Sequence, residues 1–276
     1  PAASRPTCSI SWPTANSHYS HYSHYSHYSH LEIKAEKVKP YASDLAKTGQ
    51  VEAMFDSIAP AYDTMNRLMT FGIDRLWRRK AVRLTAASRP RRILDVATGT
   101  GDFAIALARK IDGCRVDGVD LSDGMMEIGR KKVEKAGLAD RISFAKGDCL
   151  HLPYPDNTFD AVTVAFGVRN FENLKRGYAE MARVLRPGGQ LCVVELAIPE
   201  SPVVRPFYKF YTRHIIPAVG RLVSSDPRAY TYLPESIAAM PASPRMLELM
   251  ADSGFDSPRI LPLTFGVCAI HTGTKK

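Results

Sequence analysis

The length, composition and charge of the chain already exclude several classes of protein. Its 276 residues, 45% of them hydrophobic and 24% charged, suffice for one large α/β domain or two small domains. No apolar run approaches the roughly 18 residues that a bilayer-spanning helix needs. The formal net charge of +9 suits nucleic acid, an anionic membrane surface or an acidic ligand, and equally a basic face in water.

Cysteine usage argues against a metal site and against disulfide bonds. The chain has five cysteines, at positions 8, 114, 149, 192 and 268. None of them forms a Cys-x-x-Cys pair or a Cys/His spacing that would suit zinc. We therefore expect no metal and a reducing compartment, the cytoplasm. A peripheral position at the inner face of a membrane is a separate expectation, which does not rest on the cysteines.

Residues 1–30 differ from the rest of the chain. Tyr19–His30 repeats a Tyr-Ser-His triplet, without acidic residues or apolar periodicity. Such a segment buries too little apolar surface to offset the entropy of ordering it. We expect residues 1–30 to be disordered, and their composition and the missing Met suggest a mis-set start. Residues 31–276 are expected to form one domain.

Apolar spacing predicts the following elements in chain order. Two helices are expected over 51–59 and 63–84, with Pro60 and Gly72 as breaks, and they form a helical N-terminal cap. Strands are then expected over 92–96, 115–119, 142–145, 161–165 and 191–196, and helices over 103–110, 124–136 and 174–185. Short connections between alternating strands and helices predict a parallel sheet with helices on both faces.

The C-terminal part of the sequence predicts a different strand pairing. A Pro- and aromatic-rich insertion covers 199–241, and a helix is expected over 244–253. Two final strands, 260–264 and 267–272, are separated only by Phe265 and Gly266, so they must form an antiparallel hairpin, since a parallel pair needs a crossover. The predicted fold class is α/β, with a doubly wound, mostly parallel, Rossmann-like sheet of seven strands closed by this hairpin.

The strongest local motif is the segment Asp95–Asp102 (DVATGTGD), which follows a strand and opens a helix. Glycine lets a backbone turn tightly and approach a ligand, and a helix N-terminus presents free N–H groups. Gly99 and Gly101 are therefore candidate cofactor-binding residues. The segment also fits a loose dinucleotide fingerprint, so it does not by itself choose between nucleotide cofactors.

Two acidic residues follow the next two strands. Asp120 lies 21 residues after Gly99, where a carboxylate can accept two hydrogen bonds from a ribose, or else cap the following helix. Asp148 can accept a hydrogen bond from an adenine amino group while the N–H of Cys149 meets a ring nitrogen, or it is an ordinary turn residue. A nicotinamide cofactor does not require the second acid.

Taken together, these residues resemble a class I S-adenosylmethionine-dependent methyltransferase. The resemblance rests on the glycine loop, Asp120, Asp148, the strand FDAV (159–162) and the turn LRPGG (185–189). The usual loop has a further glycine where this chain has Ala97, and alanine is tolerable there only if its φ angle is negative.

Longer segments resemble the ubiquinone/menaquinone biosynthesis C-methyltransferases. They are MFDSIAPAYD (54–63), GIDRLWR (72–78), PYPDNTFD (153–160), FGVRNF (166–171) and YTYLPESI (230–237). The resemblance implies that Thr100, Asp120, Asp148 and Cys149 contact S-adenosylmethionine. It also implies methylation of a prenylated quinol ring in menaquinone biosynthesis (demethylmenaquinol to menaquinol), ubiquinone biosynthesis or both. A tocopherol- or sterol-type substrate is the alternative.

Three residues are candidates for catalysis. Arg169 follows the fourth strand, at the edge of the sheet where α/β sites lie, and its guanidinium could stabilise a phenolate. Asn170 could orient Arg169 or the ring, and Tyr62 could form a hydrogen-bonding wall. His214 is a weaker candidate base. Each could instead be structural, Arg169 as a solvated surface charge and the others as packing residues.

The segment 203–223 mixes aromatic, aliphatic and basic residues, which suits a substrate lid, a helix on a membrane surface or a core-facing helix. Two rival hypotheses remain: a nicotinamide-dependent oxidoreductase, which would lack the terminal hairpin, and a non-catalytic binding module, which would not need the two acids. We expect a prenylated quinol as partner, a peripheral contact with a membrane surface and no nucleic acid. The oligomeric state, a homodimer included, stays open.

Overall fold

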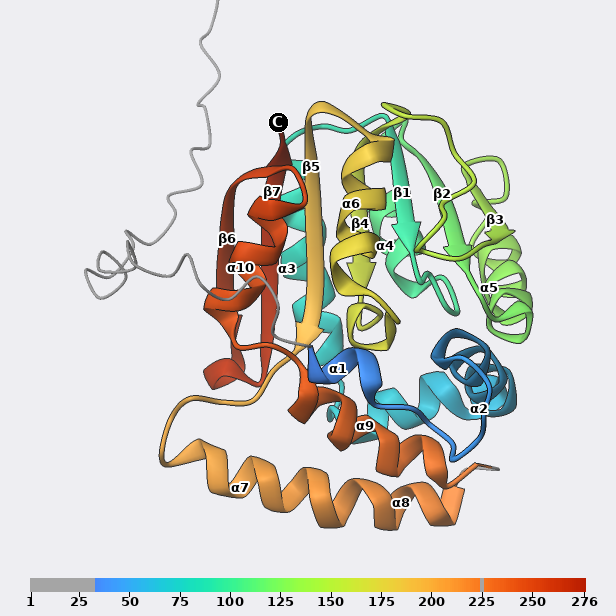
Figure 1. The fold of residues 1–276 in the computed structure, drawn as a ribbon. Helices are drawn as coiled ribbons and strands as arrows, with labels where there is room; N and C mark the ends of the chain where they lie inside the picture. Colours follow the sequence, from blue (N-terminus) through green and yellow to red (C-terminus); the bar gives the residue numbers. More distant parts are fainter. Residues whose placement is uncertain (1–32, 224–225) are drawn as a thin grey trace, which may run out of the picture. The chain divides into compact units, whose positions relative to one another are not determined.

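The computed structural model describes residues 33–223 and 226–276, so the predicted disorder of residues 1–30 lies outside the described residues. A seven-stranded sheet forms the centre of the described fold, in the order β3-β2-β1-β4-β5-β7-β6 (Figure 1). Its strands are β1 (Arg92–Val96), β2 (Arg115–Asp120), β3 (Ile142–Lys146), β4 (Phe159–Ala165), β5 (Leu185–Leu196), β6 (Phe255–Leu263) and β7 (Cys268–Lys275).

The strand directions confirm the predicted fold class. β1 pairs in parallel with β2 and β4, and the parallel pairing continues to β3 on one side and β5 on the other. β7 is antiparallel to both β5 and β6. The turn between the last two strands is the single 3-10 turn η4 (Thr264–Gly266), which is too short for a crossover, so the hairpin follows as predicted.

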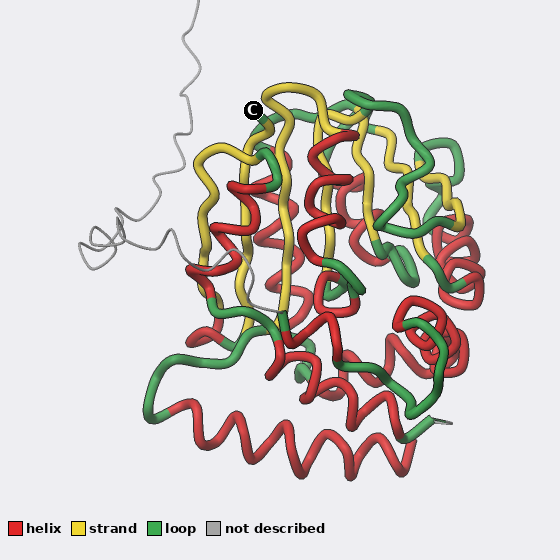
Figure 2. Tube along the Cα trace, in the orientation of Figure 1, coloured by secondary structure: helices red, strands yellow, loops and turns green. Residues whose placement is uncertain are grey.

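Helices cover both faces of the sheet (Figure 2). They are α1 (Lys34–Lys37), α2 (Lys47–Met69), α3 (Asp74–Ala86), α4 (Asp102–Lys110), α5 (Asp123–Lys135), α6 (Leu174–Val184), α7 (Val204–Phe210), α8 (Ile216–Val223), α9 (Arg228–Ala239) and α10 (Ser243–Asp252). Two short turns, the 3-10 turn η2 (Val168–Asn170) and the π-helical turn η3 (Tyr211–Ile215), complete the set. None of these helices has the length and apolar character to span a bilayer, a result that covers only the described residues.

Alternate side chains of each strand feed two separate cores, because neighbouring residues in a strand point to opposite faces. Ile93 belongs to the core that the sheet forms with α3, α4 and α5, whereas Leu94 belongs to the core formed with α6 and α10. Both side chains are fully buried. The strand ends are thereby fixed from two sides, which holds the loops that follow them in place.

A third apolar cluster joins the helices beyond the carboxyl ends of the strands. Met54, Ile58 and Met65 of α2 pack against residues of α8 and α9. Figure 1 shows α2, α7, α8 and α9 on this side of the sheet. The cluster explains why the predicted break at Pro60 is wrong: α2 continues through the proline, since packing on both sides of it offsets the lost backbone hydrogen bond.

β4 begins two residues earlier than predicted, and β5 and β6 begin six and five residues earlier. β5 begins at Leu185 because Leu185 pairs with Phe159, and the register shifts before the pairing of Ala161 with Gln190. β6 begins at Phe255 and contains a shift of register between Asp256 and Arg259. Apolar spacing does not predict the first residues of β5 and β6, because glycines and a bulge interrupt the pattern there.

Candidate active site

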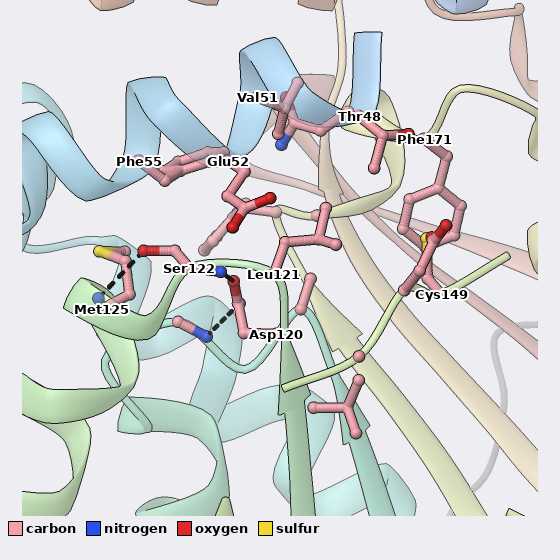
Figure 3. A pocket seen from close by; sticks show the side chains of 18 of the residues that line it. Thr48, Val51, Glu52, Phe55, Asp120, Leu121, Ser122, Met125, Cys149 and Phe171 are labelled. Atoms are coloured by element: carbon pink, nitrogen blue, oxygen red, sulfur yellow. Dashed lines mark hydrogen bonds between the residues drawn. The ribbon is translucent and has the colours of Figure 1, made fainter. Parts of the chain in front are cut away.

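Two cavities adjoin at the carboxyl ends of the strands. The first lies between the loops that follow β1 to β4 and the N-terminal half of α2 (Figure 3). The second measures about 320 Å³ and lies between the α2–α3 connection and the segment 199–241. Tyr62 and Phe166 line both cavities. The two cavities therefore adjoin at these two residues.

Asp120 is the central acceptor of the first cavity. Its Oδ2 accepts a hydrogen bond from the N–H of Gly99 (2.7 Å), and its Oδ1 accepts one from the N–H of Ser122 (2.9 Å), as Figure 3 shows. Burial raises the pKa of Asp120, and these backbone donors oppose that shift. The carboxylate is thus oriented before any ligand arrives, and each oxygen keeps a lone pair for a second donor.

Asp148 and Cys149, the two residues predicted to contact an adenine, line the same cavity. Oδ1 of Asp148 accepts a hydrogen bond from the N–H of Leu150 (2.9 Å), which fixes the loop after β3. Burial raises the pKa of the Cys149 thiol well above its usual value, so the thiol stays neutral and acts as an apolar surface. Cys149 and Phe171 lie close together on one side of the cavity (Figure 3).

Of the three residues of the glycine loop that were predicted to contact the cofactor, only Gly99 lines the cavity. The Thr100 hydroxyl instead donates to Oδ1 of Asp63 (2.7 Å) and accepts from Nζ of Lys132 (3.1 Å). Gly101 has a φ of +74°, and a Cβ there would lie 2.7 Å from the Phe144 ring. Neither Thr100 nor Gly101 lines the cavity. Their direct contact with a cofactor stays a prediction, whereas their structural roles are visible.

Ala97 adopts the conformation that the sequence seemed to forbid. Its φ is +52°, so the expected negative φ is wrong. The turn around it is held by hydrogen bonds from the N–H of Thr98 to the carbonyl of Val119 (3.0 Å) and from the Thr98 hydroxyl to Asp95 (2.7 Å). A left-handed alanine costs about 1–2 kcal/mol, and the contacts of the loop must offset this cost.

Helix α2 forms the roof of the first cavity. Its residues Thr48, Val51, Glu52 and Phe55 line the side opposite the strand ends (Figure 3). Polar contacts fasten the helix to the loops below. Oδ1 of Asp56 accepts from the Ser122 hydroxyl (2.6 Å) and the N–H of Gly124 (3.0 Å), at the N-terminus of α5.

A buried lysine fastens the start of α2. Nζ of Lys47 donates to the carbonyls of Ala35 (2.6 Å), Arg169 (3.2 Å) and Phe171 (3.1 Å), and burial lowers its pKa to about 8. The next residue, Thr48, donates to Glu172 through its hydroxyl (2.6 Å). The loop after β4 is therefore held in place by the start of α2 as well as by the sheet. Apolar spacing gives no signal for this role of Lys47.

Arg169 is buried, so its interpretation as a solvated surface charge is wrong. The residue is 6% exposed and lines the second cavity. Nη1 donates to Oε1 of Glu195 (2.9 Å) and to the carbonyl of Phe166, and the N–H of Arg169 donates to Oε2 of Glu195 (3.2 Å). Nε of Arg169 is also buried and makes no hydrogen bond to the described residues. The guanidinium therefore has a fixed position and an unused donor.

Hydroxyl and amide groups surround Arg169. Tyr62 and Tyr208 line the second cavity, and the Tyr232 hydroxyl donates to Oδ1 of Asn170 (3.1 Å). Burial raises the pKa of Tyr62, although the charge of Arg169 opposes the shift, so this phenol is a neutral hydrogen-bonding group. Asn170 itself lines the first cavity. The three candidates for catalysis thus lie where the two cavities meet.

Asp74 was not among the predicted site residues. Among the described residues that line the second cavity, it carries the only carboxylate. Its Oδ2 accepts from Nη1 of Arg78 (2.5 Å) and its Oδ1 from the Thr70 hydroxyl (2.9 Å). His214, the weaker predicted base, is exposed, lies beside the ring of Phe210 and does not line the cavity.

The ubiE/COQ5 methyltransferase family matches residues 43–275, nearly the whole described chain. The chain belongs to this family. The protein named demethylmenaquinone methyltransferase in Bacteroides fragilis is 48% identical over 240 residues, which cover 87% of this chain and 98% of the relative. Its namesake in Porphyromonas gingivalis is 49% identical over 241 residues, with the same shares of both chains.

A further relative in Geobacter sulfurreducens is named ubiquinone/menaquinone biosynthesis C-methyltransferase UbiE. It is 42% identical over 246 residues, covering 88% of this chain and 95% of the relative. The name of this relative includes both ubiquinone and menaquinone, whereas the names of the other two relatives include only demethylmenaquinone.

Solved structures confirm the fold of this methyltransferase. A methyltransferase from Thermotoga maritima described as dependent on S-adenosylmethionine has a TM-score of 0.57 at 21% identity, over 82% of this chain and 99% of that one. The [4+2]-cyclase SpnF has a TM-score of 0.58 at 22% identity, over 83% of this chain and 96% of that one. Since a cyclase shares the fold, the activity has to be argued from the site.

Proposed function

We propose that this methyltransferase transfers the methyl group of S-adenosylmethionine to a ring carbon of a prenylated quinol, with demethylmenaquinol as the main substrate. The observation that carries the proposal is the pair of adjoining cavities. One presents an oriented carboxylate, Asp120, and the other is large and aromatic, and the two share Tyr62 and Phe166. The names of the relatives favour the menaquinone precursor over the ubiquinone precursor.

The residues of the first cavity fit S-adenosylmethionine. The free lone pairs of Asp120 match the two ribose hydroxyls, because each carboxylate oxygen already has its backbone donor. Leu121, Cys149 and Phe171 provide apolar surface for an adenine ring, and Asp148 provides an acceptor for its amino group. When bound, S-adenosylmethionine supplies an electrophilic methyl group. The expectation that no metal takes part stays a prediction.

The second cavity can activate a quinol. A ring carbon becomes nucleophilic as the neighbouring hydroxyl loses its proton, so the site needs a proton acceptor and a donor for the developing phenolate. We assign the donor to the guanidinium of Arg169 and the acceptor to the carboxylate of Asp74, because both residues line this cavity. Tyr62 and Phe166 hold the ring at the junction of the cavities, where the methyl group would lie.

The insertion 199–241 forms the substrate side of the domain. Tyr208 and Tyr211 from its first half and Leu233 and Ile237 from α9 line the second cavity. An aromatic and aliphatic lining suits a naphthoquinol ring and the start of a prenyl tail. The protein would reach such an insoluble substrate from outside the membrane.

The Asp120→Ala variant tests the cofactor assignment. Two hydrogen bonds from ribose hydroxyls to a charged acceptor are worth about 1.5–3 kcal/mol each, so the affinity for S-adenosylmethionine should fall by about 10²-fold or more. Titration calorimetry measures the affinity, with Asp112→Ala, an exposed acid in a turn, as the matched control. Unchanged affinity in a folded Asp120 variant would remove this residue from the site.

Single-turnover assays test the acceptor. The enzyme is mixed with S-adenosylmethionine and a short-chain demethylmenaquinol, and in parallel with the corresponding benzoquinol, a tocopherol precursor and a sterol. We expect the naphthoquinol to be methylated fastest. Faster transfer to the tocopherol precursor or the sterol would refute the proposed substrate class.

A further inference from the structure

The exposed apolar side chains are concentrated around the second cavity. In the described chain, every exposed large hydrophobic side chain except Leu45 lies in one of three segments that line this cavity: 66–78, 203–216 and 264–267. Phe71 (77% exposed) and Phe207 (74%) both line the cavity and face solvent, so they mark where it opens. Phe265 (81%) follows Thr264, which also lines it. Exposed apolar groups gathered in this way mark an interaction surface.

The helical segment α7–η3 gives this surface its charge. Val203, Phe207 and Phe210 are spaced by four and three residues, so they share one exposed face. Arg205, Lys209 and Arg213 are spaced by four, are exposed and form a neighbouring stripe. The sequence from 201 to 225 contains no Asp or Glu.

The third side of the same segment faces the cavity through Val204, Tyr208 and Tyr211. Around α7 and η3 the order is therefore a basic stripe, an apolar stripe and the cavity wall. Helices that lie in the plane of a membrane surface combine these features, with apolar side chains in the acyl boundary and cations at the phosphates. A protein interface would be depleted of lysine at such a position.

We propose that this face docks on the surface of an anionic phospholipid bilayer. Phe207, Phe210 and Phe265 enter the acyl boundary, and Arg205, Lys209 and Arg213 contact lipid phosphates. The opening of the second cavity then faces the bilayer, so a prenylated substrate can place its ring in the protein while its tail stays in lipid. The docking follows from the surface itself, and only the route of the tail rests on the proposed function.

Co-sedimentation with vesicles tests the charge. The purified full chain is mixed with vesicles of phosphatidylcholine alone, or with about one third phosphatidylglycerol. We expect binding only to the anionic vesicles, and release by salt. Each surface cation strengthens such binding about fivefold, so the triple variant Arg205→Ser/Lys209→Ser/Arg213→Ser should bind about 10²-fold more weakly. The control Arg109→Ser/Lys110→Ser removes two exposed cations from the C-terminal end of α4 and should lose far less.

The triple variant Val203→Ser/Phe210→Ser/Phe265→Ser tests the apolar face. None of these side chains lines either cavity, and the exposed Leu45→Ser serves as control. Vesicle binding should fall about tenfold or more, because the variant lacks three apolar side chains whose transfer from water into the bilayer would stabilise the bound state. Methylation of a short-chain quinol without vesicles should be unchanged, while methylation of a long-chain quinol within vesicles should fall.

Two results would overturn the proposal. One is vesicle binding that survives in both triple variants. The other is a wild-type protein that does not bind anionic vesicles. If that protein instead forms a dimer that the apolar variant abolishes, a second copy of the chain is the occupant of this face. If the wild type binds vesicles through these residues but methylates neither quinol, the docking stands and the proposed function fails.

Discussion

Glu195→Gln would separate the structural from the chemical role of Arg169. The change keeps the shape of the side chain and removes its charge, which leaves the guanidinium of Arg169 buried without a counter-ion. The side chains of the pair are 7% and 2% exposed, so solvent screens their interaction little. Breaking a buried ion pair from one side costs about 3–5 kcal/mol. For a domain of this size the melting temperature should fall by roughly 6–20 °C.

A double variant, Arg169→Met with Glu195→Gln, completes the test. It removes both charges, and replacement of a whole buried pair by uncharged groups is often close to neutral, so most of the lost stability should return. Turnover should not return, because a preorganised donor to the developing phenolate is worth about 10²–10³ in rate. The affinity for S-adenosylmethionine should change little, since Arg169 does not line the first cavity.

The assays are chemical denaturation, single-turnover methyl transfer and calorimetry on all three proteins. An unfolding free energy of Glu195→Gln within about 1 kcal/mol of the wild type would show that the pair is not coupled as the geometry indicates. Near-normal methyl transfer by the double variant would remove Arg169 from the chemistry, and Asp74 would then be examined alone.

Three further predictions concern stability. Ala97→Gly relieves a φ of +52° and should raise the unfolding free energy by up to about 1–2 kcal/mol in denaturation, whereas a loss would show that the methyl group packs usefully. Burial lowers the pKa of His271 to about 4, so between pH 6.5 and 4 the unfolded chain is protonated at this residue while the folded chain is not. The free energy of unfolding should therefore fall as the pH falls through this range, and in a His271→Leu variant it should fall less. The pKa of Lys47, lowered to about 8, means that the wild type gains stability as the pH rises from 8 toward 10.5, and a Lys47→Met variant should not show this gain.

Much of the fold was predictable because the central strands of the sheet are parallel and buried. The bounds of β1 agree with the prediction at both ends, since such strands form continuous apolar runs between polar residues. The carboxylates at the carboxyl ends of β2 and β3 were predictable as well, because strand ends meet at one edge of the sheet. Helix α2 was predicted in two parts, because Pro60 is a local signal and the packing that overrides it comes from distant segments.

The remaining site residues depend on partners far away in the sequence. Glu195 lies in a strand and gains its role only from Arg169, 26 residues earlier. Lys47 binds carbonyls 122 and 124 residues later. Asp74 reads as an ordinary first-turn residue of a helix until the second cavity is seen around it. No local pattern of residue types encodes such contacts.

The shared wall of the two cavities matters for inhibitor chemistry. Tyr62 and Phe166 line both spaces, so one molecule that joins an adenosine to a naphthol through a short linker could occupy both at once. Once one half is bound, the other half would bind without a further loss of translational freedom, so the linked molecule would bind far more tightly than either half alone. Selectivity would come from the linker: other enzymes of this fold bind similar nucleosides, but their acceptor sites need not adjoin the nucleoside at the same angle.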